Sequence, residues 1–157
     1  MEAAARALGA DVVVRQHAPG FLRLVVTRGD ETVVVDLVLE RVPQARAAKS
    51  TIGSIVVDVP EDILANKLTA LLSRAEERDL VDVWYLERSG FRVEDALEAA
   101  RAKDEGCTPA ALAWVLSEVS IPDGARIPGD VSVDELRLFL ADLIVRLRRS
   151  AAPDRRA

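Results

Sequence analysis

The chain has 157 residues, of which half are hydrophobic and only 4% are aromatic, and its net charge is −5. For a chain of this length we expect one domain with its own core. The acidic balance argues against the broad basic surface of a protein that binds nucleic acid by its phosphates. No apolar run approaches the roughly 18 residues of a membrane span, and a single cysteine excludes an internal disulfide. We therefore expect a cytoplasmic protein without a membrane partner.

The first 60 residues are typical of a small sheet. A short helix is predicted over residues 2–8, and β-branched residues then alternate with polar ones. Strands are predicted over residues 11–15, 21–27, 32–40 and 55–57. Residues 28–31 predict a hairpin-type turn, and residues 41–52 a loop. The result is a mixed or antiparallel sheet over about residues 11–57.

Helices follow from residue 60 onward. Their boundaries carry recognisable signals: Gly90 as a C-terminal cap, Thr108 as an N-cap before proline, and Ser132 with Glu135 as a capping box. Helices are predicted from residue 60 and over residues 77–89, 93–103, 108–116 and 132–149. The fold class is α+β, a sheet packed on a C-terminal helical layer. We expect a single domain with three parts: a sheet part (residues 1–59), a helical part (60–119) and a loop with the last helix (120–157).

Charged residues lie among the apolar positions of the first helical pair. At about 100° per residue, Lys67 and Arg74 lie together at the edge of an apolar arc, two turns apart. Asp79 and Asp82 share a face with two apolar residues of the next helix. A buried ionised group is costly unless it is paired or bound. Internal pairing of Arg78 or Arg74 with the two aspartates is therefore one interpretation, and a ligand site is the other.

Asp36 interrupts an otherwise apolar predicted strand. On strict alternation it shares a face with Thr32 and Val34. A lone aspartate in that position is a candidate metal ligand or catalytic carboxylate. The alternative is an ion pair with Arg15 or Arg23 on a neighbouring strand.

Two adjoining segments carry a family resemblance. Residues 63–74 and 78–86 resemble the signature of the AbiEii/AbiGii toxin family of nucleotidyltransferases, in the polymerase-β-like superfamily. The family pattern is a lysine, alanine and a basic residue on one helix, then Arg-Asp-x-x-Asp with an aromatic residue and leucine on the next. Lys67, Arg74, Arg78, Asp79 and Asp82 match it. The likeness extends more loosely back through residues 32–39 and forward to about residue 119.

The resemblance implies transfer of a nucleoside monophosphate from an NTP to an RNA or protein acceptor, with Mg²⁺ as cofactor. It assigns catalysis to Asp36, Asp79 and Asp82, nucleotide binding to Lys67, Arg74 and Arg78, and metal binding to Asp36. From the geometry of the helical stripes, we expect one cleft at the sheet–helix junction in which Asp36 meets Lys67, Arg74, Asp79 and Asp82. The resemblance also implies a toxin of a phage-defence system with a cognate antitoxin.

The sequence departs from the family at its start. Family members begin with a Gly-Gly or Gly-Ser turn and a strand bearing Asp-x-Asp, and neither element precedes Asp36. Met1 would fall inside the helix that follows that strand. We therefore expect an incomplete polymerase-β-like core, either an N-terminally truncated member with impaired transfer and little or no bound cofactor, or a degenerate relative. The competing hypotheses are a non-catalytic remnant or binding module and an accessory module completed by another chain.

The last predicted helix carries a broad apolar stripe. Its members are Val133, Leu136, Phe139, Leu140, Leu143, Ile144 and Leu147. Ordinary packing across the helical layer is the favoured interpretation. If the stripe packs incompletely, it becomes a contact for a second copy of the chain or for an antitoxin.

Overall fold

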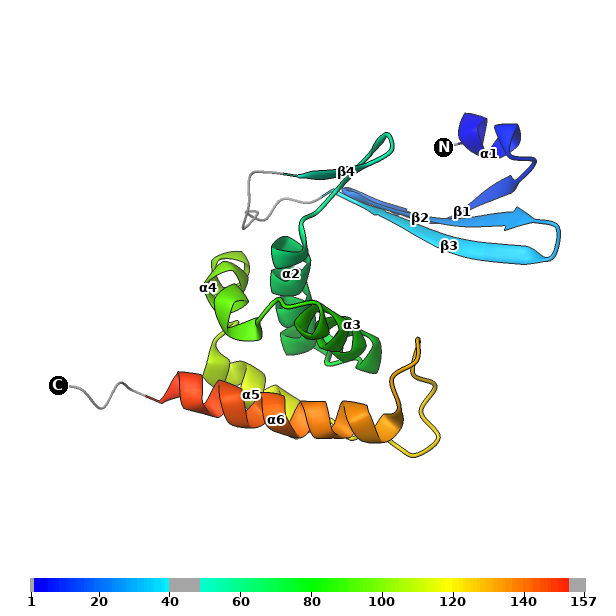
Figure 1. Cartoon of the computed structure of the whole chain (residues 1–157). Coiled ribbons are helices and arrows are strands. Elements are labelled where there is room, and N and C mark those ends of the chain that lie inside the picture. The colour runs from blue at the N-terminus through cyan, green and yellow to red at the C-terminus, as the bar shows by residue number, and fades with distance from the viewer. Residues whose placement is uncertain (1, 40–48, 153–157) are drawn as a thin grey trace. The chain divides into compact units, whose positions relative to one another are not determined.

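The computed structural model describes residues 2–39 and 49–152. The fold is α+β, as predicted (Figure 1). Its strands are β1 (Asp11–Ala18), β2 (Phe21–Arg28), β3 (Glu31–Val38), β4 (Ser50–Ile52) and β5 (Ile55–Val57). Its helices are α1 (Glu2–Ala7), α2 (Pro60–Arg74), α3 (Glu77–Arg88), α4 (Val93–Lys103), α5 (Pro109–Ser117) and α6 (Val133–Ala151). The chain divides into two compact units, the sheet unit (residues 1–42) and the helical unit (residues 43–157).

The sheet unit is an antiparallel meander with strand order β1-β2-β3. Arg28 pairs with Glu31, so the turn between β2 and β3 contains only Gly29 and Asp30 rather than the four residues predicted. Gly29 has a φ of 58°, as a tight hairpin turn of this kind requires. β1 runs three residues beyond its predicted end, past an irregularity in its pairing with β2. Local twist at such an irregularity lets the strand continue.

A second, two-stranded sheet is formed by β4 and β5. The prediction of a loop over residues 41–52 is wrong at residues 50–52, which form β4. Gly53 has a φ of 62° and forms a tight turn with Ser54, so that Ile52 pairs with Ile55. Residues 40–48, which cover most of that predicted loop and the predicted last residue of the third strand, lie outside the described residues.

The helices of the helical unit begin and end at, or within about two residues of, their predicted bounds. The Thr108 side chain accepts a hydrogen bond from the Ala111 amide (3.2 Å), and the capping box of Ser132 and Glu135 is present at the start of α6. Beyond α3, Gly90 adopts a φ of 95°, the left-handed conformation typical of glycine after a helix.

The apolar stripe of α6 packs inward, as the favoured interpretation predicted. Leu136, Leu140, Leu143 and Leu147 are buried in the core of the helical unit. Helices α5 and α6 lie side by side (Figure 1), and α2 contacts α3, α4 and α5. The central position of α2 matters for function because α2 carries two of the predicted site residues.

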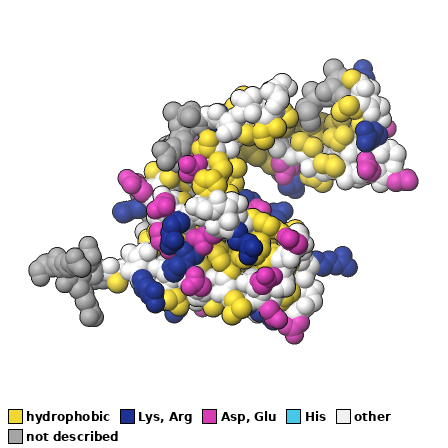
Figure 2. Space-filling view, in the orientation of Figure 1, with side chains coloured by type: hydrophobic (Ala, Val, Ile, Leu, Met, Phe, Trp, Pro, Cys, Tyr) yellow, Lys and Arg dark blue, Asp and Glu magenta, His cyan; other side chains and the backbone are white. Residues whose placement is uncertain are grey.

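Both charged and apolar side chains are exposed on the described part of the chain. Positive and negative side chains are interspersed over the helical unit on the face shown in Figure 2, and the described residues form no broad basic patch on that face. Large aliphatic side chains are exposed on β1 and β3 of the sheet unit: Val13, Val14, Val33, Val34, Leu37 and Val38. None of the described helices combines the length and hydropathy needed to span a bilayer.

Candidate functional site

The corner between α2 and α3 brings four of the predicted site residues together. Lys67 and Arg74 lie two turns apart on α2, which ends at Arg74. Ala75 then adopts a left-handed conformation, with φ 49° and ψ 42°, and its amide donates to the Leu71 carbonyl. The chain reverses there, and α3 starts at Glu77, so that Asp79 lies in its first turn. A carboxylate at a helix N-terminus is also favoured by the helix dipole.

Asp79 is the centre of this cluster. Its side chain is fully buried, and it accepts hydrogen bonds from Lys67 Nζ (3.0 Å), Arg74 Nε (2.8 Å) and Arg74 Nη2 (3.1 Å). Burial acts to raise the pKa of this carboxyl, but the bonds and charges of Arg74 and Lys67 outweigh it and hold the pKa below its ordinary value of 3.8. Asp79 is therefore ionised at neutral pH and joins α2 to α3.

Lys67 links Asp79 to Asp82. Its ammonium lies 2.5 Å from Asp82 Oδ2, and its side chain is 26% exposed, against 47% for Asp82. Burial acts to lower the pKa of Lys67, but the hydrogen bonds and charges of Asp82 and Asp79 prevail and raise it. Lys67 is therefore a cation at neutral pH, and part of its side chain reaches solvent. One of its carboxylate partners is buried and the other is open to water.

An open depression of about 290 Å³ lies beside Lys67 and Asp82. Its other lining residues are Ile63, Tyr85, Leu86 and Ser89. Tyr85, the aromatic residue of the motif, was not predicted to be part of the site. Its hydroxyl accepts from the Asp130 amide (3.0 Å) and donates to the Asp130 carboxylate. Because Asp130 lies 45 positions further along the chain, local sequence patterns carry no signal for this contact.

Arg78 does not join this cluster. Its side chain is 62% exposed and pairs with Glu76 at 2.6 Å. Glu76 also approaches Arg74 at 3.8 Å. Of the predicted internal pairs, the structure therefore contains Arg74 with Asp79, while Arg78 takes a partner that the helical periodicity did not indicate.

Asp36 lies in the sheet unit, opposite Arg23 in the register of β2 and β3. Arg23 Nε and Nη2 each donate to one oxygen of the Asp36 carboxylate at 2.7 Å, one of the two pairings anticipated for it. Its predicted convergence with Lys67 and the aspartates of α3 stays a prediction.

The described residues do not fit a magnesium site as they stand. Mg²⁺ requires oxygen ligands, and both oxygens of Asp36 are engaged by Arg23. Over residues 2–39 and 49–152, no group of three or more His, Cys, Asp or Glu side chains could hold a metal ion.

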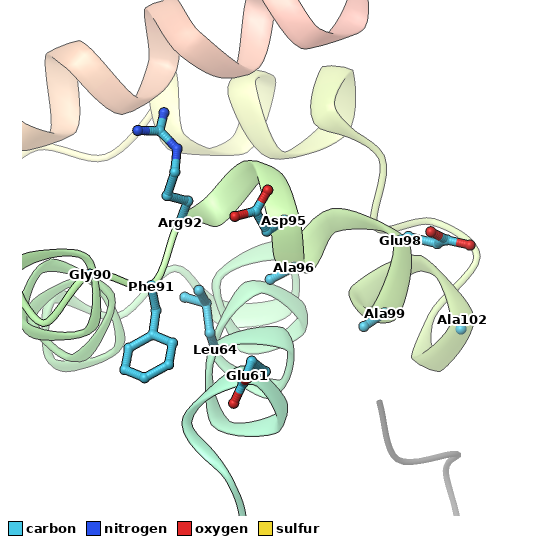
Figure 3. Close-up of a pocket in the computed structure, with 10 residues that line it drawn as sticks. All are labelled: Glu61, Leu64, Gly90, Phe91, Arg92, Asp95, Ala96, Glu98, Ala99 and Ala102. Atoms are coloured by element: carbon cyan, nitrogen blue, oxygen red, sulfur yellow. The ribbon is translucent and has the colours of Figure 1, made fainter. Parts of the chain in front are cut away.

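A larger cavity of about 630 Å³ lies elsewhere in the helical unit (Figure 3). Glu61 and Leu64 of α2 line it together with Phe91, Arg92 and a row of α4 side chains. It contains none of the predicted site residues. Since the ion-paired motif residues Lys67 and Asp82 line the smaller depression, we place the candidate site there rather than at the larger cavity.

Comparison with known proteins gives one match. The family described as nucleotidyl transferase AbiEii toxin, type IV TA system, matches residues 3–155, nearly the whole chain. No curated protein and no solved structure matches. The matched region includes the α2–α3 corner with its two cations, Lys67 and Arg74, and its two carboxylates, Asp79 and Asp82. The chain therefore belongs to the AbiEii nucleotidyltransferase toxin family, a type IV toxin–antitoxin family.

Proposed function

We propose that the chain binds a nucleoside triphosphate at the depression beside Lys67 and Asp82, as part of a nucleotidyl transfer reaction. In that reaction an acceptor hydroxyl of RNA or protein attacks the α-phosphorus. A new P–O bond forms, the bond to the β-phosphate oxygen breaks, and pyrophosphate leaves while the hydroxyl proton passes to a base. We place this activity in the cytoplasm, in phage defence controlled by a cognate antitoxin.

The observation that carries the proposal is the position of the Lys67 ammonium. An ammonium has three N–H donors, and in the described part of the chain two carboxylates engage this one. One N–H group therefore remains for a phosphate oxygen, at the edge of a depression open to solvent. Asp79 and Arg74 hold the lysine in place, since Asp79 is buried and bonded to both. The half-exposed Asp82 is the group able to orient or deprotonate the acceptor hydroxyl.

We also propose that transfer by this chain alone is slow. The intact reaction takes Mg²⁺ by family resemblance, and the Asp36 carboxylate is held by Arg23 in a two-point pair. No step in the proposal passes through a metal. Binding of the triphosphate and orientation of the acceptor are the parts assigned to these residues.

Calorimetric titration with NTPs tests the binding step. Lys67→Ala should weaken binding by about tenfold or more, because a charge-assisted hydrogen bond to phosphate is lost. Arg101→Ala, an exposed cation on α4, is the matched control and should leave affinity unchanged. Equal affinity of the Lys67 variant and the wild type would contradict the proposal.

Transfer itself is measured with NTP labelled at the α-phosphate. The isolated chain should move little label to RNA or protein. Efficient transfer that Asp36→Ala abolishes would show that Asp36 leaves Arg23 to act in catalysis. It would also refute the proposal of impaired activity.

A second candidate function is a non-catalytic module that another polypeptide completes. It is favoured by the exposed aliphatic side chains of β1 and β3, where only Leu24 of the meander's strands is buried. Exposed apolar strands are sites of strand addition. The test uses the wild-type chain with a hydrophobic dye bound to it. Two results together would favour this function: the chain binds no NTP, and the dye fluorescence falls when a β-strand peptide is added.

A further inference from the structure

Helix α6 has a second apolar stripe on the side opposite its buried one. Leu138 is 73% exposed and Val145 is 43% exposed. Ala141 between them is also exposed. Spacings of three and four residues place these side chains on one line along the helix, as in the seam of a coiled coil. In the core-facing stripe, by contrast, the leucines are packed.

A mainly apolar groove, whose lining also includes Ser117, Ser120 and Arg137, runs alongside this outer stripe. Its volume is about 330 Å³. Leu140, Ala141 and Ile144 of α6 form one wall, and residues of the segment that follows α5, including Val119 and Ile121, form the other. Arg137 of α6 joins the two walls, since its Nε donates to the Ile121 carbonyl at 2.9 Å. Ala141 belongs to both features, so a protruding leucine and a groove able to receive one adjoin on the same surface.

The charges at the two ends of α6 are opposite. Asp134 and Glu135 lie in the first turn, and Arg148 and Arg149 in the last. Asp134 precedes Ala141 by seven positions, and Arg148 follows it by seven, about 10 Å to either side along the axis. Leu138 precedes Ala141 by three positions, and Ile144 follows it by three. These residues are thus placed symmetrically about Ala141 along the helix. The acidic end of α6 is complementary to its basic end, and the protruding Leu138 is complementary to the groove beside Ile144.

We propose that a second copy of this chain docks here, with the two α6 helices antiparallel about a twofold axis near Ala141. Leu138 then enters the groove beside the partner's Ile144, and Asp134 lies opposite the partner's Arg148. Each contact occurs twice, so the interface closes as a dimer and leaves no surface for further addition. Antiparallel helices also place opposite dipole ends together. The dimer is independent of the proposed nucleotide chemistry.

Sedimentation equilibrium over a range of concentrations tests the association. The wild-type chain should approach twice its monomer mass of 17.0 kDa. Leu138→Glu should weaken the dimer at least about tenfold, because a charge would enter a mainly apolar groove. Ile55→Glu is the control, since Ile55 is 65% exposed on β5, and it should leave dimerisation unchanged. A chain monomeric at every concentration, or a dimer indifferent to Leu138→Glu, would overturn the proposal.

Charge reversal tests the antiparallel arrangement. Asp134→Arg alone and Arg148→Asp alone should each weaken the dimer, since each places like charges together across the axis. The double variant restores opposite charges at both symmetric positions and should recover the affinity. Failure of the double variant to recover would exclude this register.

Crosslinking locates the twofold axis. Ala141→Cys should form a disulfide-linked dimer on mild oxidation, because the two positions meet at the axis. Glu98→Cys on α4 is the exposed control and should stay monomeric. The natural Cys107 is fully buried and contributes no background. Equal crosslinking of both variants would contradict the proposed interface.

Discussion

The two aspartates of α3 should differ sharply in what they contribute to stability. Asp79→Ala removes a fully buried carboxylate that accepts three hydrogen bonds from Lys67 and Arg74. Removing one member of a buried ion pair costs about 3 to 5 kcal/mol. Lys67 is 26% exposed and Arg74 46% exposed, so water can replace part of what they lose. The expected loss in free energy of unfolding is therefore at the low end, about 3 kcal/mol.

Asp82→Ala should cost far less. Asp82 is 47% exposed, and within the described part of the chain its carboxylate forms an ion pair with Lys67. Exposed pairs of this kind contribute about 0 to 1 kcal/mol. The loss in free energy of unfolding should therefore stay below about 1 kcal/mol.

Urea unfolding followed by tryptophan fluorescence compares the two variants. Both tryptophans, Trp84 and Trp114, belong to the helical unit, so the signal reports the unit that contains the aspartates. Large and equal losses for both variants would make the motif purely structural. A negligible loss for Asp79→Ala would refute the argument from burial and pairing.

The effect of Asp79 should also depend on pH. Its cationic partners hold its pKa in the folded state below the ordinary value of 3.8, so its contribution is fully present above that pH. The contribution is lost as pH falls through the lower, folded-state pKa. The stability difference between wild type and Asp79→Ala should therefore be constant near neutrality and shrink under acid conditions.

Three further predictions concern local features of the helical unit. Ala75→Gly should stabilise it by up to about 1 kcal/mol in urea unfolding, because Ala75 has a φ of 49°, which is costly for a residue with a Cβ; destabilisation would contradict this. Gly129→Ala should destabilise by about 2 kcal/mol because its Cβ would overlap the Tyr85 hydroxyl, and Gly90→Ala, with positive φ but open space, should cost less. Cys107 should resist thiol reagents until the chain unfolds, since burial raises its pKa to about 11; rapid labelling of the native chain would contradict this.

Local sequence signals predicted the helices better than the sheet. The capping box at Ser132 and the cap at Thr108 act over three residues, and both are present. β4 was missed because its three residues are too few to show alternation, and its pairing depends on the turn at Gly53. The extent of β1 was underestimated because an irregularity in strand pairing leaves no signature in composition.

Local helical periodicity also predicted part of the candidate site. Lys67 and Arg74 share a helix face by periodicity alone, which correctly placed them together. Their meeting with Asp79 depends on the tight corner at Ala75, where a left-handed alanine is uncommon and carries no sequence signal. The outward turn of Arg78 likewise follows from its pairing with Glu76 rather than from helical position.

Asp82 should also restrain the nucleotide affinity of the site. The formal charges of Lys67, Arg74, Asp79 and Asp82 cancel, so a triphosphate meets no net positive charge at the cluster. Asp82→Asn removes a negative charge 2.5 Å from the Lys67 ammonium. At an effective dielectric between that of the protein surface and water, such a charge alters phosphate binding by about 1 to 2 kcal/mol. We therefore expect this variant to bind NTP several-fold more tightly while transferring the nucleotide more slowly.

Calorimetric titration measures the affinity for NTP, and label transfer measures the rate of the reaction. Asp142→Asn, on the α6 surface, is the matched control. Weaker NTP binding by Asp82→Asn would contradict the argument that the Asp82 charge opposes phosphate binding.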